Sequence, residues 1–108
     1  MDLSANNLNY IPVDDEENFS LNYLNLSHNN IYEVDNNIAN FKELEELDIS
    51  YNNIDSITYA IGGMNKITKL NLSNNNLNSL PSTIVNLTLL SSLDISSNRF
   101  MSSLNIYI

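Results

Sequence analysis

Few side chains in this sequence could do chemistry. The chain has 108 residues, with one histidine (His28), no cysteine, and 13 acidic against 4 basic side chains. A histidine beside tyrosines and carboxylates could serve as a general acid or base. No nucleophile elbow, glycine-rich phosphate loop or paired metal motif accompanies His28, however. The sequence therefore predicts a protein that is not an enzyme, with no cofactor and no metal site.

The charge balance narrows the range of partners. The formal net charge is -9, and four basic side chains cannot form a patch that neutralises several phosphates, which argues against nucleic-acid binding. An acidic chain favours partners with basic or neutral surfaces. No apolar run approaches the ~20 residues that cross a bilayer, and the first six residues lack the basic and apolar regions of an export signal. Together with the absence of cysteine, this favours an intracellular protein that does not enter membranes.

An internal repeat sets the elements that must position the candidate side chains. Segments beginning at residues 1, 24, 47, 70 and 93 share one 23-residue period without insertion, and the last copy is incomplete. Apolar first and third positions alternate with polar ones, as in a strand with one buried face. Apolar residues then recur three apart, at Ile38, Phe41 and Leu44, which is typical of a short helical or 3-10 turn. We expect five short parallel strands in repeats that must stack to bury their apolar sides.

These repeats resemble the leucine-rich repeat family, whose motif is L-x-x-L-x-L-x-x-N-x-L. The motif matches four complete segments and, from its second leucine onward, Met1 to Leu8; the four are Leu21–Ile31, Leu44–Ile54, Ile67–Leu77 and Leu90–Phe100. The resemblance implies an α/β solenoid, a right-handed superhelix shaped as a horseshoe arc. A parallel β-sheet would line its concave face, and short helical, 3-10 or irregular segments its convex face. Residues 1–108 would form a single leucine-rich repeat domain.

Asparagine is abundant, at 22 of 108 positions, and part of it forms one column of the repeat. Just after each expected strand the chain must turn, which leaves backbone N–H and C=O groups unpaired. A side-chain amide offers both a donor and an acceptor to these groups. We predict a structural asparagine ladder, with an exposed patch for a ligand as the alternative; the column consists of Asn6, Asn29, Asn52, Asn75 and Asn98.

The family usually binds its partners on the concave face, where the polar strand positions of this chain would lie. Register places Tyr23 beside Glu46, and His28 beside Tyr51. The resemblance thus implies a partner-binding patch, against the alternative of sheet-surface residues that only suit strand geometry. Its predicted members are Tyr23, His28, Glu46, Asp48, Tyr51, Lys69 and Asp94.

Two further columns of the same face have simpler interpretations. The second strand position alternates Asp and Asn along the array, from Asp2 through Asn25 and Asp48. Alternation dilutes the repulsion between carboxylates on strands about 4.8 Å apart; the alternative is a regular acidic track for a basic partner. The fourth position is always serine, and we expect that column to be exposed on an open sheet.

The predicted function is a non-enzymatic protein-interaction module that binds a protein on its concave face. Two alternatives remain open, because both ends of the array look uncapped: end-to-end stacking into homo-oligomers, and a fragment of a longer array. Met1 begins directly in strand register, and the last repeat loses the pattern after Phe100. The acidic run Asp14–Glu17 interrupts the apolar stripe of the first repeat, where a solvated edge is favoured over a calcium site.

Overall fold

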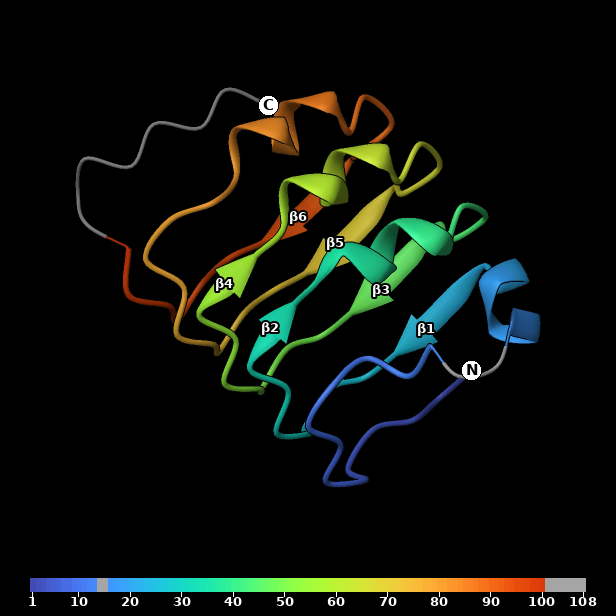
Figure 1. Cartoon of the computed structure of the whole chain (residues 1–108). Helices are drawn as coiled ribbons and strands as arrows, with labels where there is room; N and C mark the ends of the chain where they lie inside the picture. Colours follow the sequence, from blue (N-terminus) through green and yellow to red (C-terminus); the bar gives the residue numbers. More distant parts are fainter. Residues whose placement is uncertain (14–15, 101–108) are drawn as a thin grey trace.

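The computed structural model describes residues 1–13 and 16–100, and they form an arc of stacked repeats with two layers (Figure 1). The inner layer is a parallel sheet of four strands in the order β1-β3-β5-β6. These strands are β1 (Tyr23–Asn25), β3 (Glu46–Asp48), β5 (Lys69–Asn71) and β6 (Ser92–Asp94). The first repeat contributes an isolated bridge, Asp2 with Asn25, in place of the expected fifth strand. The solenoid fold with a parallel concave sheet is confirmed.

The outer layer consists of short 3-10 helices and a second, two-stranded parallel sheet. The helices are η1 (Glu16–Ser20), η2 (Asn36–Asn40), η3 (Tyr59–Gly63) and η4 (Ser82–Asn86), and the sheet pairs β2 (Glu33–Val34) with β4 (Ser56–Ile57). Side chains start two of these helices, because Asp35 accepts a hydrogen bond from the Asn37 N–H and Thr58 from the Ala60 N–H. No helix in the described ranges is long and apolar enough to cross a membrane.

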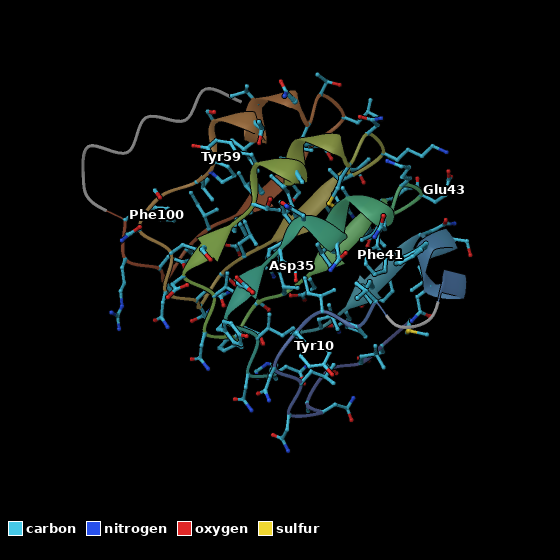
Figure 2. The ribbon with its side chains drawn as sticks, viewed as in Figure 1. Tyr10, Asp35, Phe41, Glu43, Tyr59 and Phe100 are labelled. Carbon is cyan, nitrogen blue, oxygen red and sulfur yellow. The ribbon has the colours of Figure 1, made fainter. Side chains whose placement is uncertain are left out.

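The core lies between the two layers and repeats every 23 residues. In the second repeat, Leu24 of β1, Leu26 just after it and Ile38 of η2 belong to one core cluster, and all three side chains are buried. Burying each of these side chains contributes about 1.5–3 kcal/mol. At the N-terminal end, Phe19 of η1 packs edge-on against Phe41 with ring centroids 5.2 Å apart, and Figure 2 shows Phe41 close to η1. Phe19 thus packs against the core in the repeat that contains the acidic run. Asp14 and Asp15 of this run lie outside the described residues.

We predict that Gly62→Ala destabilises the fold by about 1–3 kcal/mol, because η3 and η4 approach closely at this glycine. A Cβ atom on Gly62 would lie 2.8 Å from Thr83 Cβ and 2.9 Å from the Thr83 carbonyl oxygen. Gly63→Ala is the matched control, since nothing lies within 4 Å of a Cβ there. Urea unfolding of both variants measures the difference, and an equal free energy of unfolding would contradict this account of the helix packing.

Candidate functional site

The asparagine column forms a ladder that joins each repeat to the one before it. The side-chain amide of Asn52 donates to the carbonyl oxygens of Leu26 (3.0 Å) and Ile49 (3.1 Å), and its Oδ1 accepts from the Ile31 N–H at 3.0 Å. Two of these three bonds cross to the preceding repeat. Asn52 is buried, and each buried side-chain polar atom of the described residues has a partner. The arrangement is that of a structural element and not of an exposed ligand patch.

The ladder weakens at its first member. Asn29, Asn75 and Asn98 repeat the pattern of Asn52, each donating to carbonyls of its own and the preceding repeat. Asn6 is exposed, and its amide donates only to the Ser4 carbonyl, 3.2 Å away.

The alternating Asp and Asn column caps the turn that follows each strand. Asp48 Oδ1 accepts from the Ser50 N–H (3.0 Å) and the Ser50 hydroxyl (2.6 Å), and Asn71 Oδ1 makes the same pair of bonds with Ser73. Asp and Asn both supply an Oδ1 atom that accepts these bonds. Asn in place of Asp in alternate repeats therefore leaves the turn unchanged and removes only the negative charge of the side chain. Sequence reasoning considered charge here and missed the hydrogen bond.

The expectation that the serine column is exposed was wrong for its three central members; Ser4 is partly exposed and Ser96 is exposed. Ser27, Ser50 and Ser73 are only 7%, 4% and 5% exposed. The chain leaves the strand at this position and turns, so the strict alternation of faces no longer applies. Burial costs little at Ser50 and Ser73 because the hydroxyl donates to the neighbouring Asp or Asn.

In two of these caps the serine lowers the pKa of the aspartate, Ser4 for Asp2 and Ser96 for Asp94. The side-chain and backbone hydrogen bonds from Ser96 lower the pKa of Asp94 below its usual 3.8. A carboxylate with a lowered pKa stabilises the fold above its unfolded pKa, and this contribution is lost as pH falls through the folded value. Asp94 therefore stays charged at neutral and mildly acidic pH, at the edge strand of the concave sheet.

Five of the seven predicted site residues line one hollow on the concave face. Its volume is about 270 Å³, and its wall includes Tyr23, Glu46, Asp48, Lys69 and Asp94. Lys69 lies 3.6 Å from Glu46 across neighbouring strands, where both side chains stay solvated. The hollow is shallow and open, and within the described residues no group of three His, Asp or Glu side chains could hold a metal ion.

The other two predicted residues, His28 and Tyr51, form a stacked pair in the turns that follow β1 and β3. The rings of His28 and Tyr51 are 4.3 Å apart and 9° from parallel. Both residues have a left-handed backbone, with φ of 56° and 54°. Asn and His tolerate this region, whereas it is uncommon for tyrosine and costs about 1–2 kcal/mol. Asn74 occupies the equivalent position of the next repeat, so the same turn forms with a residue that adopts this backbone at lower cost.

Comparison with known proteins identifies the array. The sequence matches the profile of the leucine rich repeat family over residues 19–77 and 44–100. The chain belongs to the leucine-rich repeat family. No individually curated protein matches the sequence.

Two solved structures illustrate the fold of this leucine-rich repeat chain. A leucine-rich repeat protein of Leptospira interrogans is 35% identical with a TM-score of 0.74, over 76% of this chain and 21% of that one. A chain of the Drosophila melanogaster SNF/U2A' complex is 21% identical with a TM-score of 0.77, over 92% of this chain and 58% of that one. The present chain thus spans about a fifth of the first protein and 58% of the second.

We predict that Asn52→Ala lowers the free energy of unfolding by about 1–3 kcal/mol, because it leaves buried backbone groups of two repeats without partners. Asn53→Ala is the control, since that neighbouring side chain is exposed and we expect a change within about 0.5 kcal/mol. Thermal and urea unfolding of both variants provide the measurement. Unchanged unfolding of Asn52→Ala would contradict the structural role of the ladder.

Proposed function

We propose that this leucine-rich repeat chain is a non-enzymatic protein-interaction module whose concave face binds a protein partner. The observation that supports it best is the His28–Tyr51 stack. Tyrosine is enriched at the energetically important centres of interfaces, and the Tyr51 side chain is half exposed. Its backbone is strained at a position where Asn74 would serve the turn as well. The turn imposes this backbone in every repeat but does not require a tyrosine there, and a bulky side chain kept in a strained conformation is typical of functional positions.

The stacked pair lies close to the hollow along the chain. Asp48 lines the hollow and Tyr51 follows it three residues later in the same repeat, so that their Cα atoms are at most about 10 Å apart. A single extended segment of a partner can therefore contact both. The family membership supports the same role, because leucine-rich repeats generally serve as protein-binding scaffolds.

The test replaces Tyr51 by asparagine, which accepts the left-handed backbone as Asn74 does. We predict that Tyr51→Asn weakens partner binding about 30-fold, the effect of a hot-spot residue worth about 2 kcal/mol. Stability should change by no more than about 1 kcal/mol, because relief of backbone strain offsets loss of the stack. Affinity capture from lysate of the source cells, followed by quantitative mass spectrometry, compares the two proteins.

Tyr59→Asn is the matched control. Tyr59 is 68% exposed at the start of η3 (Figure 2), and Asn36 begins η2 at the equivalent position. This variant removes an exposed tyrosine from the outer layer while leaving the concave face intact. The proposal expects proteins that Tyr51→Asn loses and Tyr59→Asn retains. Capture of the same proteins at the same level by all three forms would refute concave-face binding.

A second candidate function is end-to-end assembly, favoured by the outer edge of β6. Among the described residues no strand pairs with this edge. Leu93 and Ile95 are only half-buried there, whereas their equivalents Leu70 and Leu72 are 2% and 0% exposed. An unpaired strand edge next to partly exposed core residues can pair with a strand of another copy of the chain.

Sedimentation velocity over a hundredfold dilution series tests the assembly candidate. Assembly through the β6 edge predicts that the mean sedimentation coefficient rises with protein concentration, because each added copy covers one exposed edge. A monomer at the highest concentration would exclude this candidate and leave the interaction module unaffected.

A further inference from the structure

The hollow on the concave face has the features of a receptor for one particular side chain. We propose that it holds the guanidinium group of an arginine from the partner protein. This inference rests on the proposed concave-face function and names the chemistry of its partner. The volume of the hollow, about 270 Å³, is large enough for one planar side-chain end and not for a folded element.

The charge of the hollow calls for a cation. Glu46, Asp48 and Asp94 contribute three carboxylates to its lining, against the single ammonium of Lys69. Lys69 is paired with Glu46, and the other ion pair of the described residues, Lys66 with Glu43, involves no residue of the hollow. Asp48 and Asp94 therefore keep an uncompensated negative charge at opposite sides of Asn71. Lys69 is the one basic side chain of the lining, and its ion pair is with Glu46 and not with either aspartate.

Each of these two carboxylates is held in place by one oxygen and presents the other. Ser50 and Ser96 bond only Oδ1 of Asp48 and Asp94, at 2.6 Å from the hydroxyl and 3.0 Å from the backbone N–H. Within the described residues, Oδ2 of neither aspartate has a hydrogen-bond partner. A fixed carboxylate with a free oxygen binds a donor with little loss of side-chain entropy.

The aromatic wall favours arginine over lysine. Tyr23 stands at the end of the hollow on β1 with 42% of its surface exposed. A guanidinium stacks on an aromatic ring while its five N–H donors reach carboxylates at its edge, whereas an ammonium is a compact, strongly hydrated charge. Asp48 and Asp94 lie on alternate strands, about 10 Å apart by strand spacing, which is too far for both to bind one metal ion.

The experiment is an NMR titration of the ¹⁵N-labelled full chain with three tripeptides: acetyl-Gly-Arg-Gly-amide, the lysine equivalent and the glutamine equivalent. We expect the arginine peptide to shift the amide signals of Tyr23, Asp48 and Asp94 with saturation in the millimolar range. The lysine peptide should bind at least about threefold more weakly, and the glutamine peptide should not saturate. Equal binding of the arginine and lysine peptides would overturn the guanidinium site, as would no binding at all.

The repeat itself supplies a variant that removes charge without disturbing the turn. Asp48→Asn combined with Asp94→Asn gives those strands the residue that already caps Ser27 and Ser73 from Asn25 and Asn71. We expect the dissociation constant for the arginine peptide to rise about tenfold, because charge-assisted hydrogen bonds become neutral ones. Unchanged far-ultraviolet circular dichroism and unfolding would show that the fold is kept.

Glu33→Gln combined with Asp55→Asn is the control of equal net charge. Both residues are exposed beside the second sheet, away from the hollow. If this control weakens arginine binding as much as the double aspartate variant, the attraction is nonspecific and the proposal is overturned. The arginine peptide could fail to bind while partner capture still depends on Tyr51. That result would overturn only this inference and leave the proposed function standing.

Discussion

The side-chain amide of the buried asparagine is the interaction on which the rest of the structure depends. Each repeat leaves its strand by a turn whose carbonyl and N–H groups point into the protein, where no water can satisfy them. One amide per repeat pairs groups of its own turn and of the turn before it, as Asn52 does with Ile49 and Leu26. These hydrogen bonds form between the same positions of each pair of neighbouring repeats. Neighbouring repeats must therefore share one register. The constant 23-residue period and the parallel pairing follow from this constraint.

The same constraint divides the positions of each repeat between structure and function. The first and third strand positions fill the core, the second caps the turn through Asp or Asn, and the fourth buries a serine in the three central repeats. The fifth lies in the left-handed turn, exposed for Ala5, His28 and Tyr51. This position, the outward residues at the start of each strand and the second oxygen of each capping aspartate remain available on the concave face. The two candidate binding features, the stacked pair and the wall of the hollow, draw on these positions.

The sequence was sufficient to predict the repeat register, the parallel sheet, the 3-10 segments and the asparagine ladder, because each depends on residue type at a fixed spacing. It was also sufficient to pair Tyr23 with Glu46 and His28 with Tyr51, since parallel strands 23 residues apart must align. It could not reveal the buried serines, because a period-2 pattern does not say where a strand ends. The left-handed backbone of Tyr51 was equally hidden, since tyrosine, unlike glycine or asparagine, does not signal that conformation. The hollow arises from the shape of the assembled sheet, which no single repeat encodes.

Native-state hydrogen exchange at two backbone amides tests the ladder most directly. The N–H groups of Ile31 and Ile54 donate across repeats to Asn52 and Asn75, each at 3.0 Å. If these bonds hold the array together, both amides exchange only through global unfolding, at the rate of the most protected strand amides such as that of Leu26. Exchange as fast as in an open surface turn would contradict the ladder as the element that joins the repeats.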